Sequence, residues 1–347
     1  MAKARFKKAS DIKVGVIGYG GAFNMGRKHL AEMRDAGMTP TAVCELDKDR
    51  LKVAEEDYPG IETYTSLADM LKKSDVHLIT IITPHNTHAP LGLQCLKAGR
   101  HVVCEKPMAI TTAECDKLIA EAKKRDLIVS TYHNRHWDGG ILKAKEILAK
   151  GTIGEVIRYE AGMGHYGQPR DWWRTSRTMS GGIMYDWGVH LLEYALQIIS
   201  ADIQEVSGFA HLGFWADRTP YKEDTNEDEA SACIRFKSGQ QIWLRFSTVD
   251  LQPNSLGLFW ITGTKGKLVM NHKDYALTVR NRKGETVVTK AALPENEHWR
   301  YYQNVSDHLS KGDALVITGE WARRPIHLLD LAVQSAKQNR ALKAKYI

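Results

Sequence analysis

The 347-residue sequence lacks any apolar run that approaches the length of a membrane span. Its longest apolar stretches, residues 77–84 among them, fall far short of the roughly 20 residues that a spanning helix needs. The amino end is basic, but it has neither the apolar segment of a secretory signal nor the adjacent arginines of a twin-arginine signal. We therefore expect a cytoplasmic protein without a membrane partner.

Paired cysteines and metal-binding motifs are also missing. The five cysteines form no CxxC pair, and three of them, Cys44, Cys95 and Cys104, lie in apolar segments where a thiol behaves as a small hydrophobe. No HExxH motif occurs. The net charge of +7 is spread along the chain without an arginine-rich arm, so no nucleic-acid partner is expected. We predict neither a disulfide nor a metal site.

The first part of the sequence alternates short apolar runs with amphipathic segments, which indicates βαβ units on a doubly wound parallel sheet, a Rossmann domain. The runs are apolar throughout, as strands covered on both faces are. The expected strands are residues 13–20, 39–46, 76–84, 101–107 and 127–132, and the expected helices are 25–37, 48–58, 66–75, 88–99 and 111–126. Ser66 is the expected cap of the third helix, with Asp69 at the capping-box position.

The pattern changes after about residue 132. Two helices, 139–151 and 188–200, accompany many short alternating runs, and glycines in 229–249 and 275–288 indicate hairpin turns. A closing helix is expected over 325–341. We predict a dinucleotide-binding Rossmann domain over residues 10–131 and an α+β domain with a large, mostly antiparallel sheet over 132–347, since one core rarely grows past about 250–300 residues.

A glycine loop follows the first expected strand. Gly18 and Gly20 would let the backbone approach a pyrophosphate held by the start of the next helix. Phe23 stands where a third glycine is usual, and Gly26 follows as though three residues had been inserted. Glu45 ends the second strand, where an acid can accept both ribose hydroxyls and would repel a 2'-phosphate. This favours NAD over NADP, unless Glu45 or Asp47 only caps the next helix.

Two further motifs carry chemistry. Pro107 restricts Lys106 at the carboxyl edge of the sheet, where a lysine can stabilise a developing alkoxide; the alternative is a solvated surface pair with Glu105. Asp186 and His190 are spaced i, i+4, which puts both on one helix face. A histidine there can accept a hydroxyl proton, although a capping aspartate and a packed histidine are the other interpretation.

The glycine loop, the strand-end acid, "TPHNTHA", "AGRHVVCEKP" and "GGIMYDWGVHLLE" occur in this order. Together they resemble the glucose-fructose oxidoreductase, inositol dehydrogenase and rhizopine-catabolism (Gfo/Idh/MocA) family over about residues 12–340. "EKP" with "DxGxH" is a specific signal, whereas the glycine loop is not. The resemblance implies a Rossmann domain, an open-faced sheet used for homo-dimer or homo-tetramer contacts, and transfer of a hydride between a sugar or cyclitol carbinol and a nicotinamide cofactor.

The resemblance also implies residue roles. Lys106 would contact the substrate and the nicotinamide ribose, Asp186 would orient the substrate, and His190 would be the general base. Glu105 would anchor the loop or nearby cofactor groups. The expected cofactor contacts are Gly18, Gly20, Gly21, Ala22, Phe23, Asn24, Met25, Glu45, Thr83, Pro84, Asn86, His88, Glu105, Lys106, Asn134 and Arg135.

Residues 164–182, just before the candidate helix, are expected to shape the substrate pocket. Trp172 and Trp173 could stack on a sugar ring, unless they pack the loop onto the core. The other candidates are His165, Tyr166 and Arg174, with Arg170 and Arg177 as further arginines that could bind hydroxyls or an anion.

Three functions remain open. The favoured one is an NAD-dependent sugar or polyol dehydrogenase, with His190 as base and Lys106 steadying the oxyanion. The second is an NAD-dependent glycosidase that oxidises its substrate transiently, and the third is a non-catalytic NAD-binding sensor. Joint presence of Lys106, Asp186 and His190 argues against the sensor, which needs no base.

Overall fold

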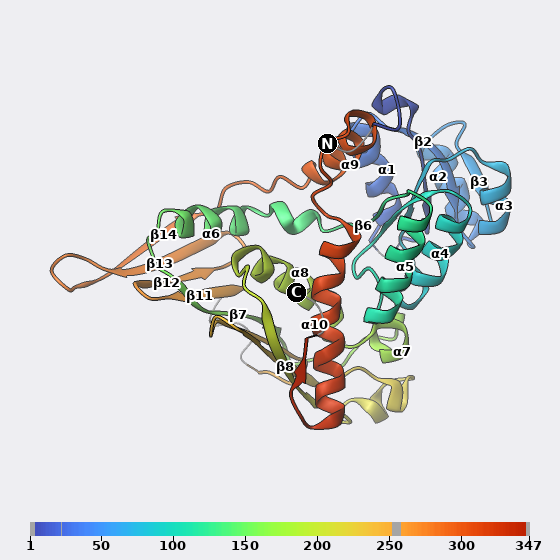
Figure 1. Ribbon diagram of the computed structural model, residues 1–347. Coiled ribbons are helices and arrows are strands. Elements are labelled where there is room, and N and C mark those ends of the chain that lie inside the picture. The colour runs from blue at the N-terminus through green and yellow to red at the C-terminus, as the bar shows by residue number, and fades with distance from the viewer. Residues whose placement is uncertain (1–3, 22, 252–257, 345–347) are drawn as a thin grey trace. The chain divides into compact units, whose positions relative to one another are not determined.

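The computed structural model describes residues 4–21, 23–251 and 258–344 (Figure 1). The chain forms two compact units. The first comprises the described residues up to Asn134 together with Trp299–Arg323, and the second comprises Arg135–His298 and the described residues from Arg324 onward. Within the described ranges, no helix combines the length and the apolar character that a membrane span requires.

The first unit is built on a six-stranded parallel sheet in the order β3-β2-β1-β4-β5-β6, the order of a Rossmann fold. Its strands are β1 (Lys13–Ile17), β2 (Thr39–Cys44), β3 (Glu62–Tyr64), β4 (Leu78–Ile81), β5 (His101–Cys104) and β6 (Val129–Thr131). Its helices are α1 (Met25–Asp35), α2 (Lys48–Asp57), α3 (Leu67–Lys73), α4 (His88–Lys97), α5 (Thr112–Lys124) and α9 (Arg300–Lys311). The predicted parallel sheet is confirmed.

The helix starts follow local chemistry. Ser66 caps α3 by accepting the Asp69 amide, as its sequence predicts. Thr111 and Glu114 form a reciprocal capping box at α5. Strands β4 and β5 are buried along their whole length, and their polar side chains, Thr80 and His101, have hydrogen-bond partners. Burial without such partners would be costly.

The second unit is built on a nine-stranded sheet in the order β14-β13-β12-β11-β7-β10-β9-β8-β15. Neighbouring strands are antiparallel except β7 and β10, which are parallel, so the predicted mostly antiparallel sheet is confirmed. The strands are β7 (Val156–Gly164), β8 (Ile203–His211), β9 (Glu229–Phe236), β10 (Gln241–Ser247), β11 (Phe259–Gly263), β12 (Gly266–Met270), β13 (Asp274–Arg280), β14 (Thr286–Ala292) and β15 (Leu342–Lys343).

Helices cover one face of this sheet and leave the other open (Figure 1). They include α6 (Gly139–Ala149) and α8 (Met184–Ile198), and α8 lies on β7 and β10. The short α7 (Arg177–Ser180) precedes α8 in the chain. In β10 the buried Leu244 alternates with the exposed Trp243 and Arg245. This alternation is expected of a sheet packed on one side only.

The segment Trp299–Arg323 departs from the predicted domain division. The sequence placed everything after residue 131 in the second domain, but this segment clusters with the first unit. It contains α9, which the sequence analysis missed, although Tyr301, Tyr302, Val305 and Leu309 are buried at helical spacing. Gly312 ends the helix in the left-handed conformation.

The last helix, α10 (Gly319–Gln338), begins before the predicted residue 325. The prediction started it at Pro325. Instead Thr318 begins it: its hydroxyl accepts the Trp321 amide and its carbonyl accepts the Ala322 amide. Pro325 lies inside the helix.

Acid should destabilise the protein through His101. This side chain is 5% exposed, and its Nδ1 accepts the Ile128 amide, which protonation would prevent. Burial, followed by repulsion from Arg5, lowers the pKa of His101 to about 3. The unfolded chain takes up a proton near pH 6.5 that the folded chain refuses, so stability is present above that pH and is lost as the pH falls.

We expect His101 to remove about 2 kcal/mol of unfolding free energy between pH 7 and pH 5. His101→Asn keeps an acceptor near the position of Nδ1 without titrating, so its pH dependence should be flatter by this amount. Urea unfolding at the two pH values measures the difference. An equal loss in both proteins would show that His101 does not cause it.

Candidate active site

The glycine loop follows β1, and two of its glycines lie close to neighbouring backbone. Gly18 has a φ of 100°, and a Cβ there would lie 3.0 Å from the Ile82 carbonyl oxygen. A Cβ on Gly26 would come within 2.6 Å of the Gly18 carbonyl oxygen. Gly26 therefore allows the close approach of helix and strand that the usual third glycine allows, although Phe23 occupies that glycine's usual position.

The rest of the loop leads into α1. A Cβ on Gly20 would meet no atom within 4 Å, whereas one on Gly21 would collide with the Arg50 guanidinium. Phe23 is 55% exposed, Asn24 caps the helix in the left-handed conformation, and Met25 is its first residue. Ala22, also predicted to contact the cofactor, lies outside the described residues. The open space at Gly20 is where a ligand can approach the backbone.

Glu45 follows β2 and points at this loop. Its Oε2 accepts the Tyr19 amide at 2.6 Å, and its Oε1 accepts the amides of Leu46 and Asp47. A carboxylate offers about four acceptor positions. Glu45 thus joins the glycine loop to the end of β2, and about one acceptor position is left for a ribose hydroxyl.

The loop after β4 contains Thr83, Pro84 and Asn86. The Thr83 hydroxyl lies 2.5 Å from the Thr87 hydroxyl, which in turn donates to the Pro84 carbonyl. Asn86 Oδ1 is buried and has no hydrogen-bond partner among the described residues. A buried acceptor without a partner is costly, so this atom is a candidate for a ligand donor.

His88, predicted to line the cofactor cleft, is instead fully buried. Its Nδ1 lies 2.7 Å from the Pro107 carbonyl oxygen and its Nε2 lies 2.8 Å from the Thr83 carbonyl oxygen. Burial lowers the pKa of His88, opposed by these two carbonyls. The side chain therefore joins the Thr83 loop to the turn at Pro107, and we assign it to holding both rather than to touching a cofactor.

The Lys106 turn follows β5, and the Lys106–Pro107 peptide is cis. The Glu105 backbone amide donates to the Ile81 carbonyl. In the Glu105 side chain, Oε2 accepts a hydrogen bond from the Lys106 amide at 2.8 Å. Burial by itself would raise the pKa of Glu105, but the hydrogen bond from His29 and the charge of Lys106 lower it to about 2. Glu105 is therefore an ionised anchor beneath Lys106.

Asp186 and His190 lie in the second unit, one turn apart in α8. His190 is 5% exposed, and Asp186 forms an ion pair with Arg174 at 3.5 Å. The motif has a glycine, Gly188, between these two residues, because a Cβ at this position would lie 3.3 Å from the Phe246 ring of β10. The glycine lets the helix lie close on the sheet.

The two tryptophans before α8 are engaged with protein. The Arg174 guanidinium lies 5.2 Å from the Trp172 ring and 5.0 Å from the Trp173 ring. These cation–π contacts hold the arginine that pairs with Asp186. The structure thus gives the tryptophans a supporting role that the sugar-stacking hypothesis did not include.

His165 and Tyr166 extend from the end of β7. The His165 amide donates to the Ser247 carbonyl, and Tyr166 forms a bridge with Val249. The Tyr166 ring is 49% exposed and packs 5.7 Å from the Trp215 ring. Both residues therefore lie beyond the end of β10, the strand on which Gly188 rests.

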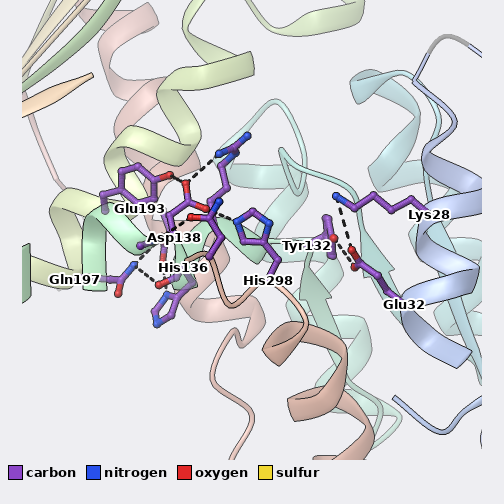
Figure 2. A network of polar contacts seen from close by, with 12 residues as sticks. Lys28, Glu32, Tyr132, His136, Asp138, Glu193, Gln197 and His298 are labelled. Carbon is purple, nitrogen blue, oxygen red and sulfur yellow. Dashed lines mark hydrogen bonds and ion pairs between the residues drawn. The ribbon is translucent and has the colours of Figure 1, made fainter. Parts of the chain in front are cut away.

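A polar network that the sequence analysis missed surrounds Asp138 (Figure 2). Asp138 accepts from Arg135 at 3.0 Å and from Tyr194 and His298. Burial would raise the pKa of Asp138, but these bonds lower it. Arg135 stacks 4.6 Å from the Trp187 ring, and that ring lies 5.7 Å from His190.

A second network in this unit joins His136, Glu193 and Gln197 (Figure 2). Glu193 is 1% exposed, and His136 and Gln197 provide the hydrogen-bond partners that a buried carboxyl group needs. Asn134 is buried at the end of the first unit, and Arg135 begins the second. Among the described residues, no group of three or more His, Cys, Asp or Glu side chains is placed to hold a metal ion.

Comparison with known proteins agrees with this architecture. Residues 12–133 match the model of an oxidoreductase family with an NAD-binding Rossmann fold, and residues 141–269 match the GFO/IDH/MocA C-terminal domain. The two units are thus those of a dinucleotide-binding oxidoreductase. The chain belongs to the Gfo/Idh/MocA family and carries its NAD-binding Rossmann fold.

Two curated relatives act on inositols by name. The myo-inositol 2-dehydrogenase of Thermotoga maritima is 32% identical over 66% of each chain, so about a third of either lies outside the match. The NADP-dependent scyllo-inositol 2-dehydrogenase IolW of Bacillus subtilis is 23% identical over 97% of each. A solved levoglucosan dehydrogenase in complex with NADH has a TM-score of 0.81, covering 97% of this chain and all of that one, and its 16% identity shows a shared fold.

The glycine loop offers a matched test. Gly26→Ala should destabilise the protein by roughly 1–3 kcal/mol, because its Cβ would meet backbone that cannot move freely. Gly20→Ala should leave stability unchanged but weaken NAD binding, because its Cβ enters the open space. Urea unfolding and calorimetric titration with NAD separate the two effects. Unaltered NAD affinity in Gly20→Ala would contradict a ligand at that position.

Proposed function

We propose that the protein is an NAD-dependent dehydrogenase acting on one carbinol of a sugar, sugar derivative or cyclitol. The observation that carries the proposal is the buried His190 one helical turn after Asp186, in a member of an NAD-binding oxidoreductase family. The inositol dehydrogenases among its relatives support a cyclic polyol as the substrate class.

The residues of the first unit fit a dinucleotide. The Gly18 turn and the open space at Gly20 would receive the pyrophosphate. Glu45 would accept a hydrogen bond from the adenosine ribose, and Asn86 Oδ1 would accept one from another donor of the cofactor. Bound NAD supplies the hydride acceptor. We assign preference for NAD to Glu45, because a carboxylate repels the extra phosphate of NADP.

Oxidation of a carbinol also releases the hydroxyl proton. We assign that proton to the imidazole of His190, because a histidine side chain can accept a proton near neutral pH. Lys106 donates a hydrogen bond to the substrate oxygen and stabilises the alkoxide as it forms. Asp186, held by Arg174, orients the substrate hydroxyls.

A substrate panel tests this function. The protein is mixed with NAD and myo-inositol, scyllo-inositol, aldoses, sugar acids and aryl glycosides, and reduced-nicotinamide absorbance and released aglycone are followed together. A rise in absorbance with a polyol identifies the dehydrogenase. Aglycone released without accumulated NADH would favour a glycosidase, and NAD binding without turnover would favour a sensor.

His190→Asn should lower kcat by roughly 10²–10⁴-fold, since it removes the base while leaving the first unit intact. NAD affinity should stay within about twofold of wild type by the same argument. His211→Asn, at the exposed end of β8, is the matched control and should remain active. Turnover retained in His190→Asn would rule out His190 as the base.

Glu45→Gln tests the cofactor preference. The amide keeps the side chain's size but removes the charge that opposes a 2'-phosphate, so the ratio of NADP to NAD affinity should rise by about tenfold. Calorimetric titration with both cofactors measures this ratio. An unchanged ratio would mean that another group selects the cofactor, and the nearby Arg50 guanidinium would be the next variant to make.

A further inference from the structure

A chain of hydrogen bonds between buried polar side chains of the first unit ends at the backbone amide of Lys106. Glu105 Oε2 accepts the Lys106 amide, and Glu105 Oε1 lies 3.2 Å from His29 Nε2. His29 Nδ1 lies 2.7 Å from the Tyr302 hydroxyl, which lies 3.0 Å from the Thr80 hydroxyl. This chain of hydrogen bonds runs from Thr80 in β4 through Tyr302 in α9 and His29 in α1 to the turn after β5.

One arrangement of protons satisfies this chain with a neutral His29. An ionised Glu105 only accepts, so His29 Nε2 carries the proton and donates to it. His29 Nδ1 then accepts from the Tyr302 hydroxyl, and the Tyr302 oxygen is left to accept from Thr80. Each donor has its acceptor, and all bonds point toward Glu105.

Burial makes this chain rigid. His29, Thr80 and Tyr302 are 1% exposed or less. The His29 ring is held edge-on 4.3 Å from the Tyr132 ring, whose hydroxyl donates to Glu32 (Figure 2). Away from water, a lost hydrogen bond leaves its partner without a replacement. Removing one hydroxyl should therefore weaken the neighbouring hydrogen bonds of this chain as well.

We propose that Tyr302 and His29 are positioning residues for Lys106, because together they hold the Glu105 carboxylate that fixes the Lys106 backbone. The effect on catalysis rests on the proposed function of Lys106, whereas the effect on its backbone does not. The proposal explains why a segment from the far end of the sequence, Trp299–Arg323, packs into the first unit.

Amide hydrogen exchange tests the positioning without a substrate. Tyr302→Phe removes the hydroxyl that His29 accepts from, and we expect the Lys106 amide to exchange about tenfold faster. Tyr301→Phe is the matched control: it is the neighbouring buried tyrosine of α9, but its hydroxyl bonds to Ser130 outside this chain. The Ile82 amide, bonded to Ile17, reports any general loosening.

Two variants of His29 sharpen the test. His29→Leu should raise Lys106 exchange as Tyr302→Phe does, and His29→Gln should restore part of the protection because its amide can donate to Glu105. The proposal is overturned if Tyr302→Phe and Tyr301→Phe leave the Lys106 amide equally protected. It is also overturned if Ile82 exchange rises as much as Lys106 exchange.

Kinetics separate this inference from the proposed function. With a polyol that the panel identifies, Tyr302→Phe should lower kcat by about tenfold and leave the NAD KM within about twofold, while Lys106→Met abolishes turnover. Full activity in Lys106→Met would refute the proposed role of the lysine but not the exchange result. Loss in Lys106→Met with no change in Tyr302→Phe would refute the positioning role alone.

Discussion

The candidate cofactor site depends on the parallel pairing of β1, β4 and β5. The Ile82 amide donates to Ile17, and the Glu105 amide donates to Ile81, so the chain leaves all three strands at one edge of the sheet. A slip in either register would separate the glycine loop from the Lys106 turn. Because these strands are buried, a slip would also leave backbone amides and carbonyls unpaired away from water, which is costly.

Buried polar side chains convert this edge into a defined geometry. In the first unit, His88 ties the Thr83 loop to Pro107, while His29 and Glu105 hold the same turn from beneath. In the second, Asp138 gathers Arg135, Tyr194 and His298, and Arg135 in turn packs on the ring beside His190. In each unit, hydrogen bonds to a buried carboxylate, Glu105 or Asp138, hold a nearby charged residue, Lys106 or Arg135. These bonds leave the charged residue few alternative positions.

Sequence reasoning predicted the features that local patterns encode. Alternating apolar runs identified the parallel sheet, Ser66 identified the start of α3, and the spacing of Asp186 and His190 predicted their common helix. It did not predict α9, the burial of His88, or the engagement of Trp172 and Trp173 with Arg174. Each of these depends on which partner a side chain meets, and that partner lies on another element.

The sequence by itself therefore determined the alternation of strands and helices in the first unit, the family, and the candidate residues for catalysis, since these follow from periodicity, capping and short motifs. Only the tertiary structure decided that Gly26 would take the place of a third glycine, that Trp299–Arg323 would return to the first unit, and that Tyr302 would support Glu105. The physical reason is that close approach and buried hydrogen bonding join residues far apart in the chain, and nothing in a local pattern records such a distance.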